Sequence, residues 1–436
     1  MTNIADRAVP ENMTSPTVNT PSLTSAPGAA CRFCGTPLRH TFVDLGMSPL
    51  CESFLSAGQL NRMEPFYPLH VFVCANCFLV QLQEYVSVES IFTEYAYFSS
   101  YSESWLTHAK AYTDQMIERF ALDSKSQVVE VASNDGYLLQ YFVASGVPAL
   151  GIEPAVNVAA AATKRGVPTL VRFFHRESAA ELAAEGKQAD LLVGNNVLAQ
   201  VPDVNSFVDG LKILLKPNGI ITMEFPHLVR LIEEIQFDTI YHEHFSYFSL
   251  LSVEKIFLAA GLKLFDVEKL ATHGGSLRVY ACHEDDRSRT VGARVLALRA
   301  EEEAAGVSSL ESYSSFAERV KDTKSALLEF LIGARRAGKR VAGYGAPGKG
   351  NTLLNYCGIR SDLLGYTVDR NPYKHGKYLP GSHIPIFTPE RIRETRPDYV
   401  LILPWNLKDE IMQQLAYIRE WGGQFVVPIP TVRVYA

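Results

Sequence analysis

The middle of the chain alternates short apolar runs with segments of helical periodicity. Strands are expected at the apolar runs, which cover residues 127–132, 149–153, 189–193 and 219–225. Helices are expected before and between these runs, over residues 100–122 and near 137–145, 155–165 and 205–215. Strands that alternate with helices predict βαβ units and a parallel sheet whose ligands bind at the carboxyl ends of the strands.

The pattern changes twice outside this region. Residues 31–84 are dense in Cys, Pro, Gly and aromatic residues, which is typical of a small, loop-rich module. Residues 288–337 have helical periodicity with a break near Gly306, and a second βαβ pattern follows. Its strands are expected at 339–345, 363–369 and 398–403.

Four regions are therefore expected. Residues 1–30 are rich in Ser, Thr, Pro, Asn and Ala, lack the apolar stretch of a signal peptide, and predict a disordered tail. The small module covers 31–84, the first α/β domain 85–285, and a helical connector with a second α/β domain 286–436.

Composition narrows the class of protein. A length of 436 residues allows two or three domains, and 47% hydrophobic with 20% charged residues is ordinary for a folded chain. The net charge of −6 offers no electrostatic footprint for nucleic acid or a membrane surface. The apolar runs are far shorter than the ~20 residues that span a bilayer. Seven cysteines, an odd number, favour a reducing compartment, so we expect a cytoplasmic protein.

Four cysteines form two CxxC pairs, Cys31 with Cys34 and Cys74 with Cys77. Two such turns can complete a tetrahedral shell of thiolates, which suits zinc and leaves no position for water. A redox role for the pairs is the alternative. Two pairs with Gly35 after the first favour a zinc ribbon, so structural Zn²⁺ is predicted.

The turns after the first strands of the α/β domain predict a cofactor site. Small residues and an acid after the second strand suit the close approach and ribose binding of a nucleotide, although these acids could instead cap a loop or be solvated. Upstream aromatic residues could face a sulfonium cation or pack in the core. The candidate cofactor-binding residues are Tyr97, Ser100, Glu130, Asn134, Gly136, Glu153, Asn195 and Asn196.

Possible proton-transfer groups concentrate at Tyr241, His242, Glu243 and His244. Within four positions they could supply a general base, its orienting partner and a hydrogen-bond donor. The spacing excludes the zinc motif HExxH, because the second His is not four residues after the first. A flexible polar loop follows at His273 and Gly274.

These motifs together resemble a known family, the three-domain sugar C-methyltransferases that act on nucleotide-linked 4-keto-deoxysugars. The resemblance runs from about Cys31 to the end and rests on the CxxC pairs, residues 130–136, 241–244, 272–276 and 343–350. It implies an α/β fold with a small N-terminal zinc-binding module, a central Rossmann-like class I methyltransferase domain and a C-terminal Rossmann-like α/β domain. S-adenosylmethionine (SAM) would be the cofactor.

The resemblance also implies roles for individual residues. His244 would remove the proton next to the ketone, with help from Tyr241 and Glu243. The substrate would be a nucleotide sugar, in a dTDP-linked form, held by Gln200, His273, Gly274, Tyr344, Lys349 and Asn351. Some members carry a histidine where this chain has Gln200, which can donate a hydrogen bond but cannot take a proton. The enzyme would then be slower, use a different substrate, or use another group such as His242.

The glycine-rich turn at 343–350, with Asp369 ending the next strand, supports a rival interpretation. It satisfies the dinucleotide fingerprint and predicts an NAD(P)-dependent oxidoreductase, although Pro347 and Lys349 fit pyrophosphate packing poorly. A non-catalytic zinc-ribbon adaptor is a third interpretation, disfavoured by the 241–244 cluster. The sequence sets no oligomeric state and is compatible with a monomer.

Overall fold

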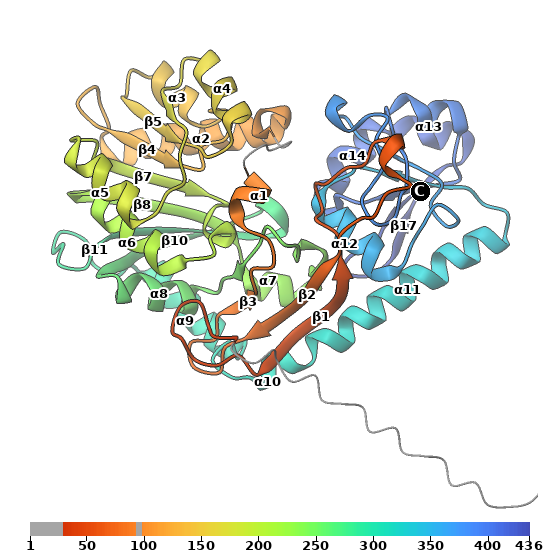
Figure 1. Cartoon of the computed structure of the whole chain (residues 1–436), viewed down its shortest axis with the longest axis horizontal. Coiled ribbons are helices and arrows are strands. Elements are labelled where there is room, and N and C mark those ends of the chain that lie inside the picture. Colours follow the sequence, from red (N-terminus) through yellow and green to blue (C-terminus); the bar gives the residue numbers. More distant parts are fainter. Residues whose placement is uncertain (1–28, 93–97) are drawn as a thin grey trace, which may run out of the picture.

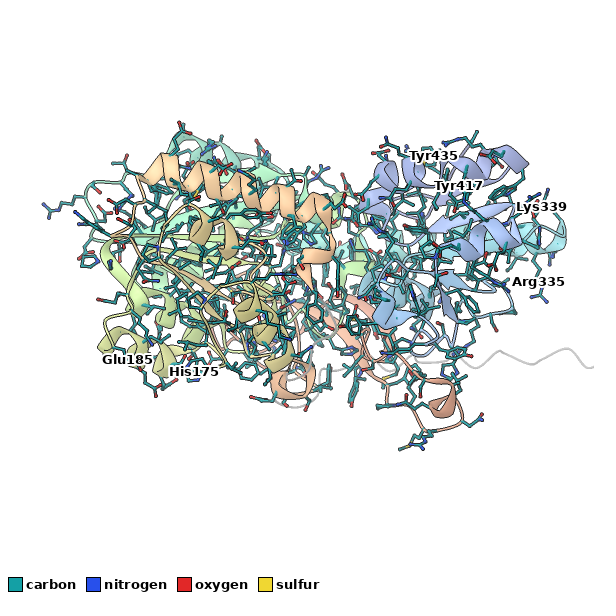
Figure 2. The ribbon with its side chains drawn as sticks, turned by 90° about the horizontal axis from the view of Figure 1, so that it is seen from above. His175, Glu185, Arg335, Lys339, Tyr417 and Tyr435 are labelled. Carbon is teal, nitrogen blue, oxygen red and sulfur yellow. The ribbon has the colours of Figure 1, made fainter. Side chains whose placement is uncertain are left out.

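The computed structural model describes residues 29–92 and 98–436. The predicted tail therefore lies almost wholly outside the described residues, as does Tyr97. The described part is built around three sheets (Figure 1). Seen from above in Figure 2, the central α/β part, with His175 and Glu185, lies opposite the C-terminal part, with Arg335, Lys339, Tyr417 and Tyr435.

The first sheet is antiparallel and lies between the two α/β parts in Figure 1. Its strands, in spatial order, are β1 (His40–Ser48), β2 (Tyr67–Val73), β3 (Val80–Leu82) and β9 (Ser246–Tyr247). Short helices accompany it at η1 (Ala57–Gln59) and α1 (Val88–Phe92). Strand β9 comes directly after the 241–244 cluster, so this cluster is joined to the N-terminal module by strand pairing.

The central sheet has seven strands, of which only β11 runs against the others. In spatial order they are β10 (Leu262–Leu270), β11 (Ser276–His283), β8 (Leu215–Pro226), β7 (Ala189–Asn195), β4 (Val128–Val131), β5 (Ala149–Ile152) and β6 (Thr169–Leu170). The strand order reverses between β4 and β7, and ligands of open α/β sheets bind at such a point.

Helices cover both faces of this sheet. Apolar side chains along each buried strand point alternately to the two faces, so both faces need to be covered. Val128 packs into one apolar cluster and Val129 into the other. One face receives α2 (Glu103–Phe120), α3 (Leu139–Ala144) and α4 (Val156–Lys164); the other receives α5 (Arg176–Ala184), α6 (Val204–Leu214), α8 (Leu250–Ala259) and α9 (Ala293–Ala304). The connections hold η2 (Ser99–Tyr101), η3 (Leu198–Gln200), α7 (Leu228–Glu233), η4 (Phe237–Thr239) and η5 (Thr272–Gly274).

The third sheet has parallel strands with one reversed edge strand, β17. In spatial order it contains β14 (Ile386–Phe387), β13 (Thr367–Val368), β12 (Val341–Tyr344), β15 (Tyr399–Ile402), β16 (Gln424–Val427) and β17 (Arg433–Tyr435). Its helices are α10 (Glu311–Ser314), α11 (Phe316–Arg336), α12 (Gly348–Cys357), η6 (Pro372–Lys374), α13 (Glu390–Thr395), η7 (Trp405–Leu407), α14 (Lys408–Gln414) and η8 (Ala416–Trp421).

Strand β2 contributes to two cores at once. Leu69, Val71 and Val73 belong to the apolar cluster of the C-terminal part, whereas Phe72 belongs to a cluster of the central part. Stacking of Phe42 in β1 on Phe316 in α11, with ring centroids 4.5 Å apart, strengthens the first of these contacts. The N-terminal module is therefore a wedge that both α/β parts bury.

The predicted strands and helices of the two βαβ regions are confirmed, with ends shifted by a few residues. The structure adds the hairpin of β10 and β11 and the two-residue strands β6 and β9, which were not expected. Among the described residues, no helix is long and apolar enough to cross a membrane.

Gly136 in the first βα turn of the central sheet offers a test of this packing. Its φ is +75°, and an added Cβ would lie 3.0 Å from Val167 Cγ2. Gly146 has the same φ, but nothing lies within 4 Å of its Cβ position. Gly146→Ala should cost about 1 kcal/mol from backbone strain, and Gly136→Ala about 1–3 kcal/mol more from overpacking. Urea unfolding of both variants measures the difference; equal losses would mean that packing is not tight there.

Candidate active site

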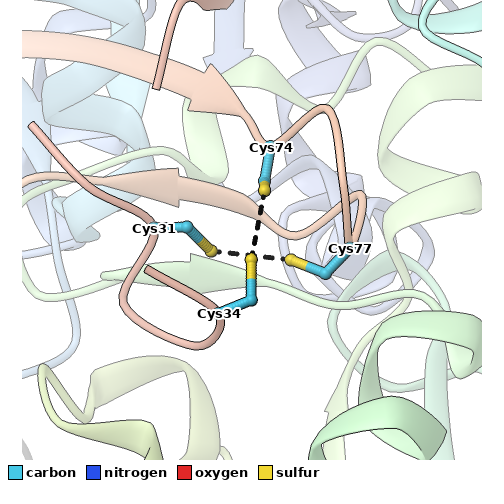
Figure 3. Close-up of side chains that lie close together, drawn as sticks. All are labelled: Cys31, Cys34, Cys74 and Cys77. Atoms are coloured by element: carbon cyan, nitrogen blue, oxygen red, sulfur yellow. Dashed lines mark hydrogen bonds between the residues drawn. The ribbon is translucent and has the colours of Figure 1, made fainter. Parts of the chain in front are cut away.

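The two CxxC turns bring their four sulfur atoms together (Figure 3). The possible ligand atoms of Cys31, Cys34, Cys74 and Cys77 all lie within 4.8 Å of one another. Cys31 Sγ lies 3.5 Å from Cys77 Sγ, and Cys34 Sγ lies 3.5 Å from Cys74 Sγ. Tetrahedral zinc with bonds of about 2.3 Å places thiolates about 3.8 Å apart, so the cluster fits structural Zn²⁺.

The first βα turn of the central sheet is tied to the acid that ends β5. The backbone N–H of Asn134 donates to Glu153 Oε2 at 2.9 Å, and that of Ala155 donates to Oε1 at 2.8 Å. Burial raises the pKa of Glu153 to about 7, against the effect of these two donors. The carboxyl group is thus fixed at the carboxyl end of β5, where it can accept hydrogen bonds from ribose hydroxyls.

Unpartnered acceptors collect near the reversal of strand order. The Oδ1 atoms of Asn195 and Asn196, at the end of β7, are buried without a hydrogen-bond partner. Glu130, in β4, is also fully buried, and burial raises its pKa well above its usual range, against the lowering effect of the Tyr137 side chain. Buried acceptors of this kind require donors. The amine, ammonium and ribose hydroxyl groups of SAM supply such donors.

Segment 99–101 lies against the first βα turn of the central sheet and is hydrogen-bonded to it. The backbone N–H of Ser99 donates to Asn134 Oδ1 at 2.9 Å, and Ser100 Oγ donates to Asp135. Arg165 pairs with Asp135 at 2.7 Å. Ser100, a predicted cofactor residue, therefore holds the turn in place through Asp135.

Trp105, in the first turn of α2, was missed at the sequence level. Its ring stacks on His108 at 4.9 Å and on Tyr137 at 5.8 Å, and meets His273 edge-on at 5.0 Å. It joins the first βα turn to the loop at His273. An aromatic residue on an amphipathic helix has the same sequence pattern as a core residue, so no local signal distinguishes it.

The 241–244 cluster lies in the loop between η4 and β9. The Nδ1–H of His244 donates to the carbonyl oxygen of Thr239 at 3.0 Å, in the tautomer that leaves the Nε2 lone pair available. The ring centroids of Tyr241 and His244 lie 4.1 Å apart. Burial raises the pKa of Tyr241 well above its usual range, so its hydroxyl keeps its proton.

The electrostatics of His244 favour the neutral ring. Burial lowers its pKa to about 4, against the Thr239 carbonyl, and nearby His273 and Lys349 lower it further. Its neutral form therefore dominates near pH 7. A buried, neutral imidazole with a free Nε2 is suited to accept a proton from carbon.

The other two members of the cluster point elsewhere. His242 Nε2 lies 3.2 Å from the carbonyl oxygen of Pro68, and its ring meets Tyr67 edge-on at 5.8 Å. Glu243 Oε1 accepts a hydrogen bond from Cys51 Sγ at 3.5 Å. Both therefore contact the N-terminal module, whereas Tyr241 and His244 lie against each other.

The predicted substrate residues approach from both sides of this loop. Gln200 ends η3, and the carbonyl of its neighbour Ala199 accepts from the N–H of Phe245 at 2.7 Å. His273 adopts a left-handed conformation, with φ +54°. Gly274 must be glycine, because a Cβ would lie 2.6 Å from Trp405 Cη2.

Lys349 belongs to a buried group that the sequence showed only in part. Its Nζ donates to Asn406 Oδ1 at 2.8 Å and lies 4.7 Å from the Trp405 ring centroid. Trp405 Nε1 donates to Asp238 Oδ2 at 2.7 Å. Burial lowers the pKa of Lys349, while Asp238 raises it. Trp405 and Asn406 belong to the short helix η7 and Asp238 to η4, and no sequence motif singled out these residues.

Tyr344 and Asn351 are engaged within the protein. The Tyr344 hydroxyl donates to Gln414 Oε1 at 3.2 Å, and Asn351 Nδ2 donates to the carbonyl of Cys51. Asp369, the acid of the dinucleotide fingerprint, accepts from the N–H groups of Ala346 and Asn371 at 2.7 and 2.8 Å. Because Asp369 and Tyr344 already have partners within the protein, they are poorly placed to bind a nicotinamide dinucleotide.

Three family models match successive parts of the chain. They are described as a "Putative zinc binding domain" over residues 31–92, a methyltransferase domain over 105–267 and a C-methyltransferase C-terminal domain over 271–430. Together with the four-cysteine cluster and the central sheet, they define a SAM-dependent C-methyltransferase that carries zinc.

One relative is similar over nearly the whole chain. The C-methyltransferase NovU of Streptomyces niveus is 38% identical over 406 residues, which cover 93% of this chain and 96% of that protein. The chain belongs to the family of SAM-dependent sugar C-methyltransferases, as its motifs predicted.

Solved structures share less of the chain. The PH0226 protein of Pyrococcus horikoshii OT3 is 14% identical with a TM-score of 0.36, covering 45% of this chain and 97% of that one. Magnesium protoporphyrin IX methyltransferase of Synechocystis PCC 6803, with bound S-adenosylhomocysteine, is 12% identical with a TM-score of 0.33, covering 41% and 83%.

The cysteine cluster predicts a defined metal content. The purified protein should hold one zinc ion per chain, and Cys74→Ser should lose it because three thiolates bind far more weakly than four. Cys282→Ala, at a buried cysteine in β11 outside the cluster, is the matched control and should keep its zinc. Elemental analysis measures both. Zinc retained in Cys74→Ser would contradict a four-thiolate site.

The buried position of His244 predicts its titration. Because burial lowers the pKa to about 4, the ring should stay neutral as the pH falls well below the value of about 6.5 for free histidine. NMR of histidine-labelled protein measures this, with the signal assigned by its loss in His244→Asn. A midpoint near that of free histidine would show that the ring is solvated.

Proposed function

We propose that this enzyme methylates the carbon next to the ketone of a nucleotide-linked 4-keto-deoxysugar. The observation that carries the proposal is His244, a buried neutral imidazole whose Nε2 is available. Transfer of methyl to carbon needs a carbon nucleophile, and the proton next to a ketone is the one that a histidine can remove. The full-length similarity to a C-methyltransferase supports the same chemistry.

In the proposed reaction, His244 Nε2 accepts the proton as the C–H bond breaks. The electron pair moves toward the ketone oxygen and forms an enolate. The Tyr241 hydroxyl, which keeps its proton, is a donor beside His244 that can hydrogen-bond to the developing oxyanion. SAM, when bound, would supply an electrophilic methyl group to the enolate carbon; its S–CH3 bond would break and leave the neutral thioether S-adenosylhomocysteine.

Local charges must hold the anionic part of the substrate, because the chain has a net charge of −6. Lys349 is a buried ammonium close enough to His244 to lower its pKa. It supplies a positive charge for a substrate oxyanion or phosphate. Gln200 supplies an amide in the turn after β7, where it can donate a hydrogen bond but cannot move a proton.

Exchange in deuterated water tests the base. Wild-type enzyme with a nucleotide 4-ketosugar should exchange the proton next to the ketone and, with SAM, form a methylated sugar. His244→Asn should lower both rates by about 100- to 10,000-fold, the usual contribution of a general base. Mass spectrometry of the sugar measures both reactions.

His242→Asn is the matched comparison, two residues away on the same loop. Because His242 faces Pro68, this variant should keep most of the activity. Undiminished exchange in His244→Asn, or an equal loss in His242→Asn, would contradict the assignment of the base.

A further inference from the structure

The start of helix α12 is covered by a loop of the N-terminal module. A Cβ added to Gly348 would lie 2.9 Å from Cys51 Sγ and 3.6 Å from Glu52 Oε1. The Glu52 carboxyl group thus lies against the amino end of α12. The turn in which the sequence indicates a place for pyrophosphate is therefore occupied by a carboxylate of the chain itself.

Lys374 completes the enclosure of Glu52. Its Nζ lies 3.5 Å from Glu52 Oε2, donates to the carbonyl of Ala346 at 2.8 Å, and lies 4.7 Å from the Phe54 ring centroid. Lys374 is buried, and the side chain of Glu52 is only 16% exposed. A charge pair removed from water in this way tolerates few other arrangements, because either charge left alone is costly.

Helix α12 holds two further segments near its start. Asn351 Nδ2 donates to the carbonyl of Cys51, and Thr352 Oγ1 donates to the carbonyl of Ile240 at 2.9 Å. Ile240 directly precedes the loop of Tyr241 and His244. Lys349, on the same helical turn, contacts Asn406 and Trp405. One short stretch of helix thus positions both Lys349 and the backbone that leads to His244.

We propose that Glu52 is a positioning residue for catalysis. Its carboxylate, clamped between Lys374 and the amino end of α12, fixes Lys349 and the His244 loop in one mutual orientation. The N-terminal module thereby acts on the reaction although its zinc takes no part in it. The catalytic role of Glu52 rests on the proposed function. Its structural role, which is to hold the start of α12, does not depend on that function.

The test compares two variants with a destabilised control. Glu52→Gln removes the charge and keeps the volume, and Glu52→Gln with Lys374→Met removes both charges of the clamp. Asp266→Asn is the control, because Asp266, on the edge strand β10, forms ion pairs with the partly exposed Arg119 and Arg294, far from the clamp. Thermal unfolding, kcat, KM for SAM and hydrogen–deuterium exchange of peptides 240–248 and 346–357 are measured for each.

Glu52→Gln should unfold at lower temperature, exchange these peptides faster and lose about tenfold or more in kcat, because small misplacements of catalytic groups cost that much. KM for SAM should stay within about twofold of the wild-type value, because the proposed SAM site and the Glu52 clamp share no contacting residues and should act independently. The double variant should regain thermal stability but keep the fast exchange and low kcat. Asp266→Asn should lose stability only.

Two results would overturn the inference. One is wild-type exchange at 240–248 in Glu52→Gln. The other is recovery of kcat together with stability in the double variant, which would mean that the two charges only balance each other. If wild-type enzyme turns over no nucleotide ketosugar, the proposed function fails, and the exchange measurement alone still decides the role of Glu52.

Discussion

The loop from Ile240 to Phe245 connects three parts of the molecule through its backbone, and the geometry of the site depends on these contacts. The backbone of Phe245 makes two of them. Its N–H donates to the carbonyl of Ala199 at the end of the central sheet, and its carbonyl accepts from Leu82 of the N-terminal module at 3.0 Å. Five residues earlier, the carbonyl of Ile240 accepts from Thr352 of the C-terminal part. The loop that carries Tyr241 and His244 is thus anchored at both ends by different domains. A loop restrained in this way keeps its side chains in place without regular secondary structure of its own.

His244 also shows how a partner decides the strength of a base. A carboxylate at Nδ1 would stabilise the charged ring and raise its pKa, as in many histidine sites. Here a backbone carbonyl fixes the tautomer, while burial and neighbouring positive charges disfavour the charged ring. The Glu243 carboxylate contacts Cys51 instead. The carboxyl group of the neighbouring residue is therefore kept from the role that its place in the motif suggests.

Features of the fold that depend on local sequence could be predicted. Strands β4, β5, β7 and β8 are mainly apolar segments, and the spacing of the four cysteines alone predicts that they come together. Strand β9 has only two residues and pairs with Val80 and Gln81, so no local pattern marks it. The contact between Asn351 and Cys51 spans 300 positions. The glycine-rich turn was recognised as a place for an anion, but its occupant, Glu52, could not be found without the fold.

Strand β2 is buried by two cores, and β9 is the edge strand that completes the first sheet. During synthesis these contacts arrive late, because residue 247 must emerge before the first sheet is complete. Val71 and Val73 belong to the same apolar cluster as Val341 and Ile402 of the last sheet, which are synthesised later still. The strands of the N-terminal module are thus synthesised early and covered late, so their apolar surface stays exposed while later parts of the chain are made.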